Sequence, residues 1–175
     1  YNPNQFGNPL NTECHRLTTG AEIVRQLPGP DPFAGIAFVA GVGTGGTLIG
    51  VGQALRATWR DAKIFAVEPA EAAVMTGGPN GPHGIFGIGD GFIPEIAGDG
   101  GDGLHPMIDG VDVVSTEEAM SVAQELGDTY GLCVGISSGA NFAAARRLKS
   151  RFQTVITVFA DGHQKYHSTG LHEPT

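Results

Sequence analysis

Residues 36–55 read IAFVAGVGTGGTLIGVGQAL, and this stretch decides the fold. Its first part, residues 36–40, is apolar throughout and predicts a buried strand. A turn with four glycines and two threonines follows at residues 41–47. After the turn, apolar residues recur at helical spacing. The stretch therefore predicts a strand, a glycine-rich loop and a helix in direct succession.

A second apolar run at residues 63–68 predicts the next strand and completes a βαβ unit. Neither run alternates with polar residues, which is typical of parallel strands that helices cover on both faces. We expect loops at residues 1–11 and 71–106, further helices at residues 18–26, 115–130 and 140–151, and further strands at residues 111–114, 132–136 and 154–159. The expected fold class is α/β, with a mainly parallel open sheet and helices on both faces.

The bulk properties predict one globular domain, residues 1–175, that binds a small soluble molecule. The chain has 175 residues, of which 41% are hydrophobic, and a net charge of −8 at pH 7. This charge leaves no basic face for nucleic acid or for an anionic membrane. The two cysteines, Cys14 and Cys133, are far apart, which indicates the reducing cytoplasm, and we expect Cys133 in the core. No apolar run approaches the roughly 20 residues that span a bilayer.

The glycine-rich loop at residues 41–47 predicts a phosphate site. Successive backbone N–H groups and the positive end of the following helix attract an anion at such a turn. The alternative is a turn that only lets the helix pack closely on the strand. The bearer of the phosphate also stays open, because Gly41, Gly43 and Gly46 match the GxGxxG fingerprint of NAD-binding Rossmann domains. Glu68 ends the next strand, where such domains carry the acid that binds the ribose.

Three further segments separate these alternatives. They are QFGNPLN at residues 5–11, PHGIFGIGDGFIP at residues 82–94 and GISSGA at residues 135–140. Together with GVGTGGT, and in this order, they resemble the cysteine synthase family, which includes the cystathionine β-synthases. The resemblance covers nearly the whole chain. It implies the larger, C-terminal part of the two-domain, tryptophan-synthase-β-like fold of fold-type II pyridoxal-phosphate enzymes.

The resemblance implies a site for pyridoxal 5′-phosphate and a site for the amino-acid substrate. The residues that it assigns to the phosphate are Gly43, Thr44, Gly45, Gly46 and Thr47. Ser137 is assigned to the pyridine nitrogen, with Ser138 as the alternative. Gln5 is assigned to the substrate carboxylate, and Gly87 and Ile88 to the loop beside the substrate. A hydroxyl group at the ring nitrogen does not hold that nitrogen protonated, which favours elimination over transamination.

The resemblance also implies a lysine upstream of the glycine-rich loop, which binds the cofactor covalently and takes a proton from the substrate. This chain contains only Lys63, Lys149 and Lys165, and we expect each of them at the solvated surface. We therefore expect no catalytic residue in this chain, which would be inactive alone as a fragment of a complete enzyme. A degenerate or split homologue is the alternative.

By the same resemblance, the complete enzyme is a cytoplasmic, homodimeric cysteine synthase that acts on O-acetylserine or a similar activated serine and on sulfide. Cystathionine β-synthases and cysteine desulfhydrases share these motifs, so the leaving group and the nucleophile stay open. Two alternatives belong to other classes of protein. One is an NAD-binding Rossmann domain, and the other is a catalytically inactive binding partner of an intact synthase. We expect no nucleic acid and no membrane as partners.

A few polar residues near the C-terminus suggest other sites. His163, His167 and His172 suggest zinc, but the resemblance places this tail near the ring end of the cofactor, so we expect no metal site. Asp161 or His163 is expected near the ring. Asp90 precedes a glycine, which is a common turn pair, and we expect it in a solvated turn.

Overall fold

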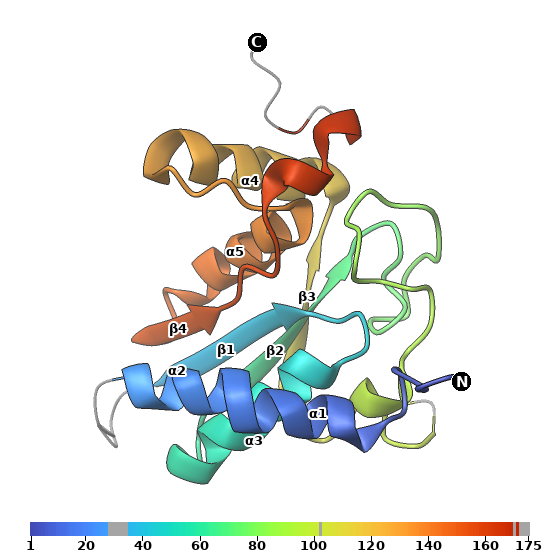
Figure 1. Ribbon diagram of the computed structural model, residues 1–175, viewed down its shortest axis with the longest axis vertical. Helices are drawn as coiled ribbons and strands as arrows, with labels where there is room; N and C mark the ends of the chain where they lie inside the picture. Colours follow the sequence, from blue (N-terminus) through green and yellow to red (C-terminus); the bar gives the residue numbers. More distant parts are fainter. Residues whose placement is uncertain (28–34, 102, 170, 172–175) are drawn as a thin grey trace.

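The computed structural model describes residues 1–27, 35–101, 103–169 and 171. Its centre is a four-stranded sheet with the strand order β3-β2-β1-β4 (Figure 1). All three strand pairs are parallel. The strands are β1 (Ile36–Gly41), β2 (Lys63–Pro69), β3 (Gly110–Val114) and β4 (Thr154–Thr157). The expected α/β class with a parallel sheet is therefore confirmed.

The helices lie in two layers, one on each face of the sheet (Figure 1). One layer holds α4 (Thr116–Tyr130) and α5 (Ile136–Leu148), and the other holds α1 (Pro9–His15), α2 (Ala21–Gln26) and α3 (Gly46–Thr58). Alternate residues of β1 enter different cores. Ala37 and Val39 pack in the core that α4 and α5 cover, whereas Phe38 and Ala40 pack in the core that α3 covers. Two covered faces explain why the strands are apolar without alternation.

An Asn-Pro pair starts the N-terminal helix, although we expected a loop over residues 1–11. The side chain of Asn8 caps α1, because its Oδ1 accepts a hydrogen bond of 3.0 Å from the N–H of Leu10. Pro9 occupies the first helical position, where a missing N–H costs nothing. A π-helical stretch, Arg16–Gly20, then leads directly into α2. The helix expected at residues 18–26 is thus the end of a longer helical segment.

The expected strand at residues 132–136 is wrong. Gly131 ends α4 with a φ of +68°, and the N–H of Leu132 bonds back to the last turn of that helix at 3.0 Å. Gly135 already caps α5. Between these caps, Val134 forms only an isolated β-bridge. The two helix caps leave too few residues for a strand.

The same connection corrects two further expectations. Cys133 is exposed instead of buried, because the short link between two helices runs over the surface. Helix α5 begins at Ile136, ahead of residue 140, so Ser137 lies in the first turn of the helix. The loops expected at residues 71–106 are confirmed for the described residues 71–101 and 103–106, apart from a short 3₁₀ turn, Glu95–Ala97. No helix of the described residues is long and apolar enough to cross a membrane.

Candidate functional site

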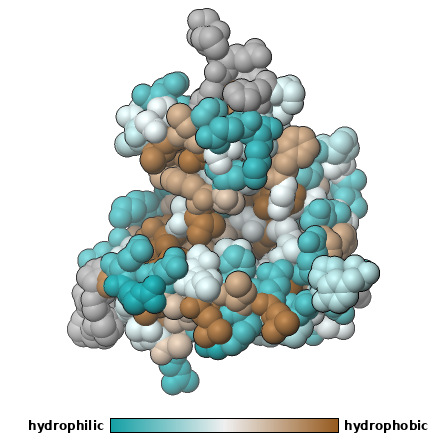
Figure 2. All heavy atoms as spheres, in the orientation of Figure 1, coloured by the Kyte–Doolittle hydropathy of each residue, from teal (hydrophilic) through white to brown (hydrophobic). Residues whose placement is uncertain are grey.

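A pocket of about 530 Å³ opens at the carboxyl ends of β1 and β4. The chain leaves β1 through α3 toward β2 and β3, and it later returns to the opposite side of β1 as β4. Open α/β sheets bind ligands where the strand order reverses in this way. The lining comes from the glycine-rich loop, residues 86–88, the start of α5 and residues 158–166. Figure 2 shows apolar residues in the hollow between the layer of α4 and α5 and the layer of α1.

The pocket brings together most of the site residues that we expected from the sequence. Those that line it are Gly43, Thr44, Gly45, Thr47, Gly87, Ile88 and Ser137. They come from segments far apart in the sequence. Gly43 and Gly87 approach so closely that a Cβ atom at Gly43 would overlap the carbonyl oxygen of Gly87. The absence of a side chain at residue 43 therefore allows the two loops to approach each other.

The glycine-rich loop ends in the first turn of α3. Gly45 caps this helix with a φ of +86°, a conformation that favours glycine. Within the part of the chain that the structure describes, the main-chain N–H groups of Gly43, Thr44, Gly45 and Thr47 donate no hydrogen bond to the protein. Unpaired N–H groups at the N-terminus of a helix of 13 residues form a site for an anion.

Two side chains of α1 hold the threonine hydroxyl groups of this loop. The Nδ2 group of Asn11 donates to Oγ1 of Thr44 at 3.0 Å. Nε2 of His15 lies 3.2 Å from Oγ1 of Thr47, and Nδ1 of His15 lies 3.1 Å from Oγ1 of Thr19. The sequence analysis missed both residues, because these contacts with the loop span 33 and 32 positions.

Asn141 is another residue that the sequence analysis missed. It is 3% exposed and lines the pocket from α5. Its Oδ1 accepts a hydrogen bond of 2.7 Å from the N–H of Gly41, and its Nδ2 donates to the carbonyl of Val158 at 2.9 Å. The amide therefore ties the ends of β1 and β4 to α5. A buried-face polar residue beside the alanine run of α5 was the available signal.

The neighbouring serines of α5 have different contacts. Ser138 is fully buried, and its Oγ accepts a hydrogen bond of 3.1 Å from the N–H of Ala160. Ser137 lines the pocket and is 6% exposed. The hydroxyl group of Ser138 thus holds the segment that follows β4, which leaves Ser137 to contact a ligand.

Two of the expected residues do not line the pocket. The N–H of Gly46 donates to Oγ1 of Thr44 at 3.2 Å, and a Cβ atom at Gly46 would overlap Oδ1 of Asn11. Gly46 therefore allows α1 to approach the loop. Gln5 is exposed, and its carbonyl oxygen accepts a hydrogen bond of 2.9 Å from Nδ2 of Asn11. Gln5 is thus linked through Asn11 to the glycine-rich loop.

The wall of the pocket formed by residues 158–166 carries a carboxylate. Oδ2 of Asp161 accepts a hydrogen bond of 2.9 Å from the hydroxyl group of Tyr166, and burial together with this carboxylate raises the pKa of Tyr166 to about 12. Oδ1 of Asp161 is buried and has no hydrogen-bond partner among the described residues. The ring of Tyr166 stacks on Phe86, with 6.3 Å between the centroids. Lys165 also lines the pocket, although 72% of its side chain is exposed.

The geometry removes the main support for a dinucleotide site. Glu68, the expected partner of a ribose, is 1% exposed. Its carboxylate accepts hydrogen bonds from the N–H groups of Met75 and Thr76, at 2.8 and 3.0 Å, and from the hydroxyl group of Thr76. These contacts fix the loop that follows β2 and keep the carboxylate away from any ligand.

The remaining residues to place are the histidines suggested as metal ligands and the lysines Lys63 and Lys149. No group of three or more His, Cys, Asp or Glu residues is placed to hold a metal within the described parts of the chain. His172 and the side chain of His167 lie outside the described residues. Lys63 is paired with Asp109 at 3.1 Å. The amine of Lys149 donates to the carbonyl of Gln153 at 3.1 Å.

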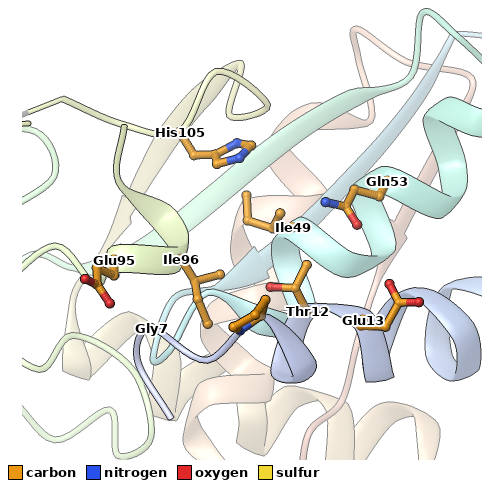
Figure 3. A pocket seen from close by; sticks show the side chains of 9 residues that line it. Gly7, Thr12, Glu13, Ile49, Gln53, Glu95, Ile96 and His105 are labelled. Atoms are coloured by element: carbon orange, nitrogen blue, oxygen red, sulfur yellow. The ribbon is translucent and has the colours of Figure 1, made fainter. Parts of the chain in front are cut away.

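A second hollow, of about 520 Å³, lies between α1, α3 and the Glu95–Ala97 turn (Figure 3). Glu13 at its rim is paired with Arg16 at 2.6 Å. His105 on the opposite side accepts a hydrogen bond at Nδ1 from the N–H of Met107. The two pockets share no lining residue. Three of the four sequence motifs, the glycine-rich loop, residues 82–94 and GISSGA, contribute lining to the first pocket, whereas Gly7 and Pro9 of QFGNPLN line the second.

The position of His15 predicts a pH dependence of stability. Burial lowers the pKa of His15, whereas the unfolded chain takes up a proton near pH 6.5. A histidine that the fold holds neutral stabilises it above the unfolded pKa, and this stability is lost as the pH falls below about 6.5. We expect His15→Gln to flatten the fall in unfolding free energy between about pH 7 and 5.5 by a few tenths of a kcal/mol, given partial exposure.

Urea unfolding at several pH values measures this effect. His105→Gln is the matched control, because the pKa of His105 is also lowered by burial and by Arg56, while its side chain does not contact the loop. His105→Gln should flatten the dependence of the unfolding free energy on pH in the same way. If the unfolding free energy of His15→Gln falls with pH as steeply as that of the unmodified chain, the fold does not hold His15 neutral.

Comparison with known proteins agrees with the geometry. The chain is 39% identical to a cysteine synthase of Staphylococcus aureus, over 98% of this chain and 54% of that protein. Among solved structures, an O-acetylserine sulfhydrylase of Entamoeba histolytica superposes with a TM-score of 0.87 at 35% identity, over 100% of this chain and 50% of the other. An O-acetylserine-dependent cystathionine β-synthase of Helicobacter pylori superposes with a TM-score of 0.84 at 36% identity, over 99% of this chain and 54% of the other.

The chain spans about half the length of the curated relatives that it matches. The family described as "Pyridoxal-phosphate dependent enzyme" matches residues 1–161. The match includes the glycine-rich loop, Ser137 and the loop with Gly87. The chain therefore belongs to the family of pyridoxal-phosphate-dependent enzymes.

Proposed function

We propose that this chain forms the cofactor-holding part of a pyridoxal-phosphate-dependent cysteine synthase, which replaces the β-substituent of O-acetylserine by sulfide. The observation that carries the proposal is the convergence of separate segments on one pocket at the reversal point of the sheet. Similarity to a cysteine synthase and to an O-acetylserine sulfhydrylase supports the reaction. We infer a cytoplasmic homodimer from family resemblance, and the two exposed, unpaired cysteines are compatible with a reducing compartment.

The pocket fits pyridoxal 5′-phosphate in its chemistry. One end offers the unpaired N–H groups and threonine hydroxyl groups of the glycine-rich loop, which suit a phosphate. Ile88 and Val158 offer apolar surface between the ends, which suits a flat ring. Ser137 offers a hydroxyl group on α5, which suits a ring nitrogen. We propose that residues 43–47 hold the phosphate and that Ser137 contacts the ring.

The cofactor, when bound, supplies an electron sink for the bonds at the α-carbon of an amino acid. The residues of this chain orient the reacting groups. A hydroxyl group at Ser137 does not keep the ring nitrogen charged, which moderates this sink. The stacked pair of Phe86 and Tyr166 offers aromatic surface at the pocket wall. We propose that Gln5 and the loop at Gly87 and Ile88 border the substrate, and that a lysine outside this chain moves the α-proton.

The different nucleophiles of the relatives leave a second candidate within the family. The Helicobacter pylori protein is an O-acetylserine-dependent cystathionine β-synthase, and it matches this chain as well as the sulfhydrylase does. O-acetylserine is part of the name of both enzymes, so it is the substrate that they have in common. We propose O-acetylserine as the first substrate and sulfide as the second, with a thiol amino acid as the alternative.

Two measurements test the proposal. The purified chain should bind 4′-deoxypyridoxine 5′-phosphate, which has the ring and the phosphate but no reactive aldehyde, and it should not bind NAD. A fusion of the N-terminal part of the Staphylococcus aureus enzyme to this chain should form cysteine from O-acetylserine and sulfide, whereas this chain alone should form none. Binding of NAD, or cysteine formation by the chain alone, would overturn the proposal. The variant Lys149→Ala should leave the binding of the analogue unchanged within about twofold, because this exposed amine donates to the carbonyl of Gln153 and does not line the pocket.

A further inference from the structure

We propose that Asn11 is a positioning residue that fixes the hydroxyl group of Thr44 as a hydrogen-bond donor to the phosphate of the bound ligand. The proposal rests on the function proposed above, because it needs a phosphate group in the glycine-rich loop. Asn11 does not itself line the pocket, and it acts through Thr44.

The argument begins with the hydrogen-bonding capacity of a threonine hydroxyl group, which is one donor and two acceptor positions. Oγ1 of Thr44 accepts one hydrogen bond from Nδ2 of Asn11, at 3.0 Å, and a second from the N–H of Gly46, at 3.2 Å. Both acceptor positions are therefore filled from the protein side. The remaining capacity is the O–H donor, and Thr44 lines the pocket. A ligand in the pocket thus meets a hydroxyl group that can only donate.

The orientation of Asn11 is itself fixed. Its Nδ2 group carries two hydrogens, and the second one is donated to the carbonyl of Gln5 at 2.9 Å. Its Oδ1 lies against Gly46, at a place where a Cβ atom would overlap it. A turned amide would put Oδ1 against two acceptors, the carbonyl of Gln5 and Oγ1 of Thr44, with only one hydrogen between them. The contacts therefore hold the amide with its donor group toward Thr44.

Aspartate has nearly the shape of asparagine but only accepts hydrogen bonds when it is ionised. In Asn11→Asp, the hydroxyl group of Thr44 would turn its single hydrogen toward the new carboxylate. A phosphate would lose this donor and would also face a negative charge behind the loop. We expect the chain's affinity for 4′-deoxypyridoxine 5′-phosphate to fall by about 30-fold or more. Asn11→Ala leaves the hydroxyl group free to rotate, and we expect a loss of about three- to tenfold.

Asn8→Asp is the matched control for charge. Asn8 lies on the same helix and caps α1 through its Oδ1, a role that aspartate also fills well. It does not line the pocket. We expect this variant to bind the analogue within about threefold of the unmodified chain, because an exposed charge acts through solvent. Equal losses in Asn8→Asp and Asn11→Asp would overturn the proposal in favour of a general charge effect.

A double-mutant cycle separates positioning from a purely structural role. In a Thr44→Val background there is no hydroxyl group to orient, so Asn11→Ala should change the affinity for the analogue by less than about twofold. A full loss in that background would mean that Asn11 acts through the fold, and it would overturn the proposal. Thr44→Ser keeps the hydroxyl group and should restore the full effect of Asn11→Ala. Unfolding curves without ligand show whether each variant is folded.

The outcomes for the two proposals differ. If the unmodified chain does not bind the analogue, the proposed function fails and this inference fails with it. If the unmodified chain binds the analogue and Asn11→Asp and Asn11→Ala bind equally well, only the inference about Asn11 fails. Inorganic phosphate is the second probe, and its affinity should fall in the same order of variants, because the contact is with the phosphate alone.

Discussion

Gly43→Ala is expected to lower the affinity of this chain for 4′-deoxypyridoxine 5′-phosphate by about 100-fold. A Cβ atom at residue 43 would overlap the carbonyl oxygen of Gly87 and approach Ile88. Forcing these loops apart costs about 1–3 kcal/mol, which corresponds to roughly 5- to 150-fold in a binding constant. The new methyl group would also stand at the pocket wall, beside the unpaired N–H groups of the loop. Both effects act on binding, so we place the expected loss toward the upper end.

The matched control is Gly35→Ala, immediately before β1. A Cβ atom there would lie 3.5 Å from the ring of Phe152, which is an ordinary contact. The same change in composition should therefore leave the affinity for the analogue within about twofold. Isothermal titration calorimetry measures both variants. If Gly43→Ala binds as tightly as Gly35→Ala, the close approach of the two loops has no part in holding the ligand.

Much of the fold is legible in the sequence because its strands are buried on both faces. The runs at residues 36–40 and 63–68 are apolar without a break, and each is followed by a segment with clear turn or helix signals. Helix α4 was equally clear, because Ser115 caps its start through the N–H of Glu118 and Gly131 ends it. Local signals were sufficient for these elements, because each is marked by an unbroken apolar run or by residues that cap both ends of a helix.

The wrong elements arose where a local signal has two uses. An Asn-Pro pair is typical of loops, and it is also the cap and first residue of a helix, as Asn8 and Pro9 are here. The apolar run at residues 132–136 has the composition of a strand, yet it is filled by the caps of two helices. Periodicity over so few residues cannot separate a strand from an apolar connection.

The candidate site shows a similar division. The glycine-rich loop and Ser137 were found because their motifs are contiguous in the sequence. Asn11 and Asn141 each bond to a residue far away along the chain, 33 and 100 positions distant, so their roles could not be assigned from the sequence. Asp161 was expected near the ring, and the structure adds that one of its oxygens is buried without a hydrogen-bond partner among the described residues. Contacts of this kind belong to the tertiary structure alone.

Ser137→Asp is expected to change both the stability of the site and the protonation of a bound ring. Ser137 is 6% exposed and lines the same pocket as Asp161, whose buried Oδ1 has no hydrogen-bond partner among the described residues. A second carboxylate in this pocket would be uncompensated, and we expect the unfolding free energy of the ligand-free chain to fall by about 3 kcal/mol. Two neighbouring carboxylates also raise the pKa of one of them.

If residue 137 contacts the ring nitrogen, a carboxylate there would hold that nitrogen in its protonated form. The bound 4′-deoxypyridoxine 5′-phosphate should therefore show the absorption spectrum of its pyridinium form in Ser137→Asp and not in the unmodified chain. In the fusion with the Staphylococcus aureus N-terminal part, turnover of O-acetylserine should fall by about 100-fold, because a protonated nitrogen would make the ring a stronger electron sink that no longer favours elimination over competing reactions. Ser137→Ala removes one hydrogen bond and should lower the affinity by about three- to tenfold without changing the spectrum.

Ser150→Asp is the control for an added charge, because Ser150 is exposed and follows α5. It should change neither the spectrum nor the affinity beyond about twofold. The comparison also separates the pyridoxal reading from the dinucleotide one. In a dinucleotide site Ser137 would have no pyridoxal ring to contact. Ser137→Ala would then leave the affinity for the analogue unchanged. If Ser137→Asp leaves the spectrum of the bound analogue unchanged while Gly43→Ala still lowers the affinity as expected, the phosphate lies in the loop but the ring does not reach α5.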